Sequence, residues 1–152
     1  MSHPKPAFVM QPQEGATFNI GMHLVTEKLT SEHSGGNYYV FQQLSPPGSF
    51  VPPHVHSFED EVAFIIEGDF DVFLDGRTTR AGPGAILNFA RGTYHGFANV
   101  GDTPGKTSWV ITPGRSFQAF FRELATFPPG PPDFARLDAL HTKYGMTMPP
   151  PG

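Results

Sequence analysis

Two histidines and a following group of acidic residues are the part of the sequence whose side-chain types and spacing could do chemistry. His54 and His56 are separated by one residue and follow Pro52-Pro53. On an extended strand, residues two positions apart point to the same side, so both imidazoles would share one face. Imidazole nitrogens bind first-row divalent metals, which makes this pair a candidate metal-binding element.

A carboxylate and a third imidazole could complete such a site. Glu59, Asp60 and Glu61 follow the histidine pair, and His95 comes after Gly92 at the start of a later apolar segment. Each of the three acidic residues is a candidate carboxylate ligand. A His-x-His pair alone is more often a half-buried polar pair than a metal site, so the hypothesis requires separate strands to bring these side chains together.

The segments that would hold these side chains are predicted to be β-strands. Short apolar runs alternate with Gly, Pro and Asp through residues 36–113, which is typical of a β-sandwich or barrel. Glu67-Gly68 and Asp75-Gly76 stand where tight hairpin turns are expected, because Gly tolerates positive φ. An all-β fold follows. The predicted strands are Tyr38–Leu44, Val62–Ile66, Phe70–Leu74, Ala85–Phe89 and Ser108–Ile111, with another alternating segment around Phe18–Val25.

The pattern changes to helical spacing near the C-terminus. Ser116 is expected to cap a first short helix, and Asp133 a second helix that ends before Gly145. We expect the helices to cover the barrel or a partner subunit, His141 to lie on the surface, and Met146–Gly152 to be loose. The expected apolar faces are Phe117, Phe120, Phe121 and Leu124 in the first helix, and Phe134, Leu137, Leu140 and Tyr144 in the second.

Composition excludes several classes of protein. The 152 residues carry 10 Lys+Arg and 14 Asp+Glu, a net charge of −4 with no basic stripe, so no nucleic-acid partner is expected. The absence of Cys excludes disulfides, iron–sulfur clusters and thiolate ligation. No segment approaches the roughly 20 apolar residues that span a bilayer, and residues 1–15 lack the apolar stretch of a secretion signal. We therefore expect one cytoplasmic domain over residues 1–152, with no membrane partner.

The spacing of the candidate ligands resembles the two signature motifs of the cupin superfamily. The motifs span residues 48–99, about a third of the chain. One position departs from the pattern, because Ala90 stands where the second motif usually has Pro, which affects a turn and not a ligand. The first motif is matched by Gly48, His54-Val55-His56, Glu61 and Gly68, and the second by Gly84, Gly92, His95 and Asn99.

This resemblance implies both a fold and a cofactor. The fold would be a cupin jelly-roll β-barrel, also called a double-stranded β-helix, with its core at about 36–114 and short C-terminal helices at about 116–145. Glu61 would be the carboxylate ligand, since six residues separate it from the turn glycine Gly68, whereas Asp60 would point to the opposite side of the strand. The cofactor would be one divalent transition metal ion, Fe, Mn, Ni, Co, Cu or Zn. The implied ligands are His54, His56, Glu61 and His95.

Small cupins with this arrangement resemble bacterial quercetinase-type dioxygenases. The resemblance implies that a flavonol-like or other enol or phenol substrate binds the metal, that Glu61 takes the hydroxyl proton, and that dioxygen adds to the activated ring. By strand alternation, Ala63, Ile65 and Phe97 share the ligand faces and are expected to line an apolar substrate pocket, although inward apolar residues of a barrel usually form only core.

Two other classes of function stay open, and a homodimer is expected. The same ligands could serve a non-oxidative metal-dependent isomerase, cyclase or lyase. They could also serve a non-catalytic protein that binds a metal or a small molecule. The expected dimer follows from an exposed barrel edge and from the twofold symmetry of most soluble oligomers.

Overall fold

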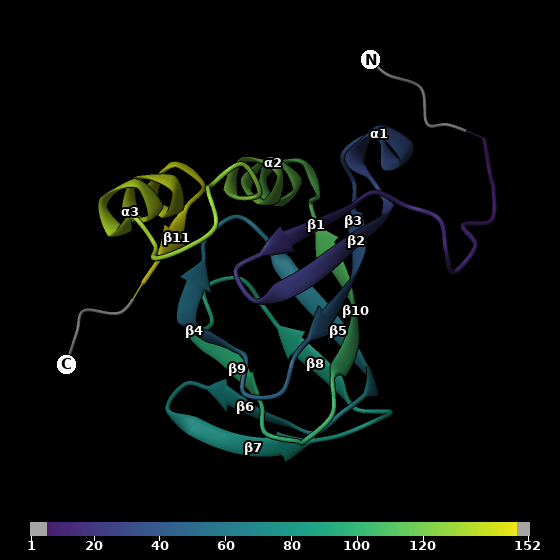
Figure 1. Ribbon diagram of the computed structural model, residues 1–152. Helices are drawn as coiled ribbons and strands as arrows, with labels where there is room; N and C mark the ends of the chain where they lie inside the picture. Colours follow the sequence, from purple (N-terminus) through teal and green to yellow (C-terminus); the bar gives the residue numbers. More distant parts are fainter. Residues whose placement is uncertain (1–5, 149–152) are drawn as a thin grey trace.

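The strands of the chain form two facing antiparallel sheets in the computed structural model, which describes residues 6–148 (Figure 1). One sheet has the order β1-β2-β3-β10-β5-β8, and the other has the order β11-β4-β9-β6-β7. The strands are β1 (Thr17–Ile20), β2 (His23–Leu29), β3 (Tyr39–Ser45), β4 (Phe50–His56), β5 (Asp60–Glu67), β6 (Phe70–Leu74), β7 (Arg77–Ala81), β8 (Ile86–Phe89), β9 (His95–Asn99), β10 (Gly105–Thr112) and β11 (Met146–Thr147). The helices are α1 (Ser31–Ser34), α2 (Arg115–Leu124) and α3 (Phe134–Lys143).

Inward-facing aromatic side chains from both sheets form the core. Phe41 on β3 and Trp109 on β10 stack with their ring centroids 5.9 Å apart, and Phe97 on β9 lies 5.4 Å from Trp109. Burial alternates along β10, which contacts β3 on one side and β5 on the other. The period-2 pattern of the sequence therefore reports the inward faces correctly, and the predicted all-β architecture is confirmed.

The two predicted turns have different roles. Asp75 and Gly76 both have positive φ, 46° and 82°, and they join β6 to β7 as the expected tight hairpin. Gly68 also has positive φ, 99°, but it connects β5 of one sheet to β6 of the other. The expected hairpin at Glu67-Gly68 is therefore wrong, and this turn is instead a corner between the sheets.

The two C-terminal helices lie together at one end of the barrel (Figure 1). α2 begins two residues earlier than expected, with Gly114 and not Ser116 at its N-cap, and it buries the predicted phenylalanine face. Asp133 caps α3 as predicted, since its side chain accepts a hydrogen bond from Arg136 N at 3.1 Å. Phe134 is 70% exposed, so the expected apolar face of α3 is wrong at that position. Within residues 6–148, every helix is too short or too polar to cross a membrane.

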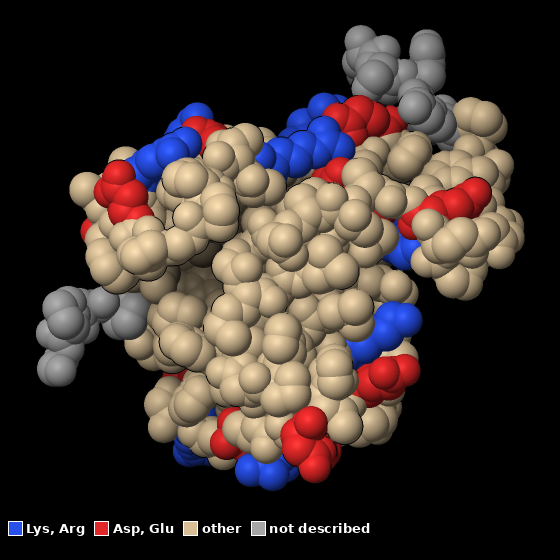
Figure 2. Space-filling view, in the orientation of Figure 1, with Lys and Arg blue, Asp and Glu red and all other residues tan. Residues whose placement is uncertain are grey.

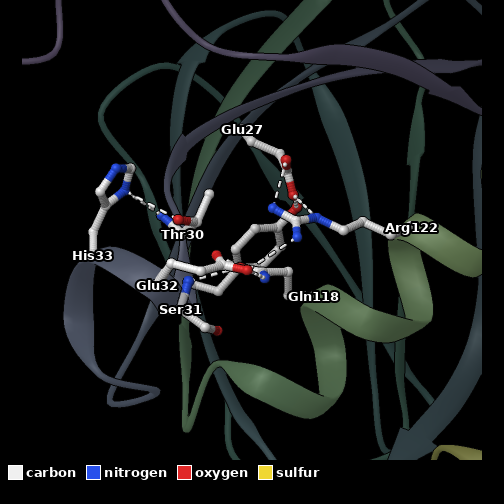
Figure 3. A network of polar contacts seen from close by, with 8 residues as sticks. Glu27, Thr30, Ser31, Glu32, His33, Gln118 and Arg122 are labelled. Carbon is white, nitrogen blue, oxygen red and sulfur yellow. Dashed lines mark hydrogen bonds and ion pairs between the residues drawn. The ribbon is translucent and has the colours of Figure 1, made fainter. Parts of the chain in front are cut away.

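Charged side chains gather over α1 and α2 (Figure 2), and a partly buried polar network there ties α2 to the barrel (Figure 3). Arg122 of α2 donates to both oxygens of Glu27, at 3.1 and 3.2 Å, and to Glu32 at 3.2 Å. The Tyr39 hydroxyl also donates to Glu27, at 2.8 Å. Gln118 bridges from α2 to Ser31 N and to the carboxylate of Glu32. The helix is thus fixed by charge-assisted hydrogen bonds as well as by its apolar face.

The segment after α3 folds back onto the barrel. Met146 lies opposite His56 in the β11–β4 register, and Ser57 N donates to Gly145 O at 2.9 Å. The expectation of a loose tail is therefore wrong for Met146–Thr147, while residues 149–152 lie outside the described part of the chain. His141 is only 9% exposed and packs against Phe120, so its expected surface position is also wrong.

Candidate metal centre

Three strands bring the four motif residues together inside the barrel. His54 and His56 lie on β4 and His95 on the adjacent β9, whereas Glu61 enters from β5 of the facing sheet. All four side chains are buried, with relative exposures between 2% and 6%. One ligand atom from each residue lies within 4.8 Å of the others. The structure thus brings together the residues that the motif spacing singles out.

A local irregularity of β4 sets the position of His54. The β4–β9 register shifts between Val51 and His54, where two prolines without N–H groups interrupt the ladder. On β9, a Cβ added to Gly96 would lie 2.7 Å from Val51 O and 2.9 Å from Pro53 N. The backbones can approach this closely only because residue 96 has no side chain, and the result is that His54 stands opposite His95.

The nitrogen and oxygen atoms that face the centre of the cluster are close to one another. His95 Nε2 lies 2.8 Å from Glu61 Oε2, and His56 Nε2 lies 3.6 Å from the same oxygen. His54 Nε2 lies 3.0 Å from His56 Nε2. Each imidazole therefore turns its Nε2 toward a shared point near the carboxylate.

Backbone carbonyls fix the proton on two of the imidazoles. His54 Nδ1 lies 2.8 Å from Pro52 O, and His95 Nδ1 lies 3.0 Å from Thr93 O. A carbonyl oxygen only accepts hydrogen bonds, so each Nδ1 must carry the proton and donate. In a neutral ring the Nε2 atom is then unprotonated, and its lone pair points into the cluster.

Burial and charge set the protonation of the other groups. Desolvation, together with the neighbouring imidazoles His56 and His95, lowers the pKa of His54 to about 4, so this ring is neutral. Desolvation alone would raise the pKa of Glu61, but the attraction of His56 and His95 holds that pKa below its usual range. Glu61 is therefore a carboxylate. For His56, the carboxylates Glu61 and Glu59 outweigh desolvation and raise the pKa.

This arrangement fits a bound cation. Glu61 Oε2 is fully buried and makes no hydrogen bond of good geometry within residues 6–148. The Nε2 atoms of His54 and His56 face each other at 3.0 Å, a contact between lone pairs unless a proton or a cation lies there. Three imidazole nitrogens and one carboxylate oxygen are donors that first-row divalent metals accept.

The other residues considered in the sequence differ in whether they face the solvent or the barrel interior. Asp60 points away from the cluster, as strand alternation predicts, and pairs with Arg91 at 3.1 Å. Ala63, Ile65 and Phe97 are all buried, at 0%, 2% and 5% exposure.

Two phenylalanines that the motif analysis did not assign to the site support its imidazoles. Phe89 stacks on His95 with centroids 4.2 Å apart, and Phe117 of α2 lies 5.1 Å from His56. Strand and helix periodicity marked both residues as buried. Periodicity alone could not predict which imidazole each phenylalanine contacts.

Comparison with known proteins identifies relatives of this arrangement. A family model described as a cupin domain matches residues 41–111. The chain is 26% identical over 117 residues to quercetin 2,3-dioxygenase of Bacillus subtilis strain 168, which covers 77% of this chain and 34% of that protein. It is 33% identical over 67 residues to the tetracenomycin polyketide synthase protein TcmJ of Streptomyces glaucescens, covering 44% of this chain and 45% of that one. The chain therefore spans less than half the length of these two relatives.

Solved structures share the fold. KdgF from Halomonas sp. superposes with a TM-score of 0.66 over 74% of this chain and 99% of its own, at 17% sequence identity. At this identity the likeness establishes the fold alone. Together with the match over residues 41–111, it confirms the predicted jelly roll.

Proposed function

We propose that this chain, whose residues 41–111 match a cupin domain, is a metal-dependent dioxygenase that acts on a flavonol-like or other enol- or phenol-bearing small molecule. The observation that carries the proposal is the convergence of three imidazoles and one carboxylate within 4.8 Å in the barrel interior. The proposed ligands are His54, His56, Glu61 and His95. They would hold one divalent ion of Fe, Mn, Ni, Co, Cu or Zn.

Four protein ligands fill the coordination sphere of a tetrahedral ion but leave that of an ion with a larger coordination number open. A five- or six-coordinate ion keeps one or two positions for a small molecule when the protein fills four. A divalent ion in this place would supply Lewis acidity, which lowers the pKa of a coordinated hydroxyl group.

Glu61 is the proposed proton acceptor. Its Oε2 atom is buried and ionised, and within residues 6–148 it makes no hydrogen bond of good geometry. It can therefore accept the hydroxyl proton of an enol or phenol and hold it away from bulk water. Ala63, Ile65 and Phe97 are the proposed apolar floor that excludes water below the substrate.

The relatives support two reactions that share this proton transfer. The match to a quercetin dioxygenase extends over 77% of the chain and favours oxidation of the substrate by dioxygen. The matches to TcmJ and to the polyketide synthase CurC of Streptomyces cyaneus, at 33% and 32% identity, point to a polyketide substrate, for which a non-oxidative cyclase or isomerase is the alternative reaction. Polyketide chains enolise readily, so either reaction can begin with a proton passing to Glu61 Oε2. A purely binding function is the third candidate.

Oxygen dependence separates these candidates. The protein is loaded in turn with each of the six metals and offered flavonols and enolisable polyketide analogues, with and without air. The proposal predicts oxygen uptake that matches flavonol consumption and falls at least about 100-fold in Glu61→Gln. Turnover without oxygen would establish the non-oxidative reaction instead. No turnover with any metal in either atmosphere would leave only a binding function.

A homodimer is the proposed assembly. Phe64 and Ile86 lie opposite each other in the β5–β8 register, on the outward side of the sheet, and are 40% and 63% exposed. β8 also ends its sheet. Light scattering should give twice the chain mass for the wild type and a shift toward the single chain for Ile86→Lys. A wild type that stays a single chain at high concentration would contradict the proposal.

A further inference from the structure

Glu59 is a buried carboxylate for which the four-residue cluster has no role. It lies between β4 and β5 and is 1% exposed. Its Oε2 atom makes no hydrogen bond of good geometry within residues 6–148, yet it lies 3.4 Å from His56 Nδ1. A buried carboxylate is costly unless something compensates it, so its position beside this imidazole requires a reason.

The three imidazoles differ in what holds their Nδ1 atoms. The Nδ1 atoms of His54 and His95 each donate to a backbone carbonyl two residues earlier. Among the hydrogen bonds of the described residues, His56 Nδ1 has no such carbonyl acceptor. The carboxylate of Glu59 occupies the equivalent place. All three rings thus have an acceptor on the Nδ1 side. For His54 and His95 it is a backbone carbonyl, and for His56 it is the side chain of Glu59.

His56 also lies between two carboxylates that compete for its proton. Glu59 Oε2 is 3.4 Å from Nδ1. On the opposite side of the ring, Nε2 faces Glu61 Oε2 at 3.6 Å and the unprotonated Nε2 of His54 at 3.0 Å, so Glu59 has two acceptors to outweigh. A neutral imidazole carries one proton. If that proton is on Nδ1, Nε2 can bind a metal. If it is on Nε2, directed at Glu61, the nitrogen is blocked.

We propose that Glu59 is a positioning residue that holds the proton of His56 on Nδ1 and so keeps Nε2 open for the metal. The inference rests on the metal site of the proposed function and adds to it a determinant of metal affinity outside the ligand set. Metal-bound imidazoles are commonly oriented in this way by a carboxylate on the other ring nitrogen.

Charge balance agrees with this role. Within residues 6–148, Glu59 and Glu61 form ion pairs with imidazoles and with no lysine or arginine. A divalent cation bound between the imidazoles would compensate negative charge buried at these two side chains. Glu59 would then contribute to affinity through both the ring orientation and the charge.

The test uses the full chain without metal and two readouts that do not depend on activity. Long-range ¹H–¹⁵N NMR of histidine-labelled protein, at alkaline pH, reports which ring nitrogen of His56 carries the proton. A Co²⁺ titration against a competing chelator reports affinity. The variants are Glu59→Leu, which removes the acceptor, and Glu59→Gln, which keeps an acceptor oxygen in the same shape. Asp60→Asn is the matched control, because Asp60 is the adjacent carboxylate but points to Arg91.

We expect His56 to carry its proton on Nδ1 in the wild type, in Glu59→Gln and in Asp60→Asn, and on Nε2 in Glu59→Leu. Co²⁺ affinity should fall about 10- to 100-fold in Glu59→Leu, fall less in Glu59→Gln, and stay unchanged in Asp60→Asn. If Glu59→Leu does not fold, the role of Glu59 is still tested by the His56 tautomer in the wild type and by the Co²⁺ affinity of Glu59→Gln relative to that of Asp60→Asn.

Three results would overturn the inference. One is an Nε2 proton on His56 in the wild type. Another is a Glu59→Leu variant that folds and matches the wild type in both readouts. The third is a loss of Co²⁺ affinity in Glu59→Gln as large as in Glu61→Gln, which would make Glu59 a ligand. Failure of the wild type to bind Co²⁺ or any other of the six metals would instead remove the proposed function, and the NMR result would still decide the role of Glu59.

Discussion

His54 and His95 lie directly opposite each other on β4 and β9, and their imidazole rings are 4.5 Å apart between centroids. This cross-strand pair is the base of the candidate site. His56 stands two residues further along β4, and Glu61 reaches the pair from the facing sheet. The site therefore depends on the spacing of two strands within one sheet and on the packing of the two sheets against each other.

The first prediction concerns the close approach of β4 to β9. An alanine at position 96 would place its Cβ 2.7 Å from Val51 O, so β4 must move away and take His54 with it. We expect Gly96→Ala to destabilise the fold by about 1–3 kcal/mol, as overpacking does, and to weaken Co²⁺ binding. Urea unfolding and a Co²⁺ titration measure the two effects.

A second glycine serves as the control for that variant. An added Cβ at Gly101 would meet its nearest atom, Asn99 Oδ1, at an ordinary contact distance of 3.4 Å. Gly101→Ala should therefore change both quantities little. Equal behaviour of the two variants would show that the strand spacing at residue 96 does not set the site.

The second prediction concerns the network that holds α2. The carboxylate of Glu27 is only 5% exposed. Without Arg122, the Tyr39 hydroxyl is the one side-chain donor that Glu27 keeps among the described residues. We expect Arg122→Met to lower the free energy of unfolding by about 1–3 kcal/mol. The exposed pair Arg80–Asp71 is the control, since Arg80→Met should cost about 1 kcal/mol or less. A cost no larger for Arg122→Met would mean that the apolar face alone holds α2.

The third prediction is a pH dependence of the same network. Burial would raise the pKa of Glu32, but hydrogen bonds from its own N–H, Thr30 and Gln118, and the charge of Arg122, lower it to about 2. Because the pKa of Glu32 in the folded protein is below the ordinary value of 4.5, ionised Glu32 stabilises the fold fully at pH values above 4.5. This stabilisation is lost as the pH falls from 4.5 toward about 2.

The comparison of wild type with Glu32→Gln isolates this contribution. The difference in their free energies of unfolding should be constant near neutral pH and shrink as the pH falls through that window. The effect should be modest, because the Glu32 side chain is 54% exposed and solvent screens it. A difference that does not change between neutral and acidic pH would contradict the assigned interactions.

The sequence allowed the inward faces of the strands to be predicted because alternation is a local property. His54 and His56 share a face, and Asp60 and Glu61 point to opposite sides, as the period of a strand requires. Glu59 could not be assigned in this way. It lies in the bend between β4 and β5, where alternation no longer fixes the direction of a side chain.

The features of the site that the sequence did not predict depend mostly on contacts between segments far apart in the chain. The register shift of β4 against β9 and the role of Gly96 depend on two segments about 40 residues apart in the chain. His141 is buried because α3 packs against α2, where its ring lies 5.8 Å from that of Phe120, and this contact between two helices cannot be predicted from the local sequence. Phe134 has the spacing of a buried helix position, but α3 packs through Leu140 and His141 and leaves its first turn exposed.

The metal content of the protein shows whether the four buried side chains form a metal site. The protein purified from its own host, beside His54→Ala and the control His33→Ala, is analysed for transition metals by elemental analysis. His33 lies on α1, outside the four-residue cluster. We expect about one equivalent of a single divalent transition metal in the wild type and in His33→Ala, and its loss in a folded His54→Ala. A wild type without metal, or a His54→Ala variant that keeps its full metal content, would contradict this expectation.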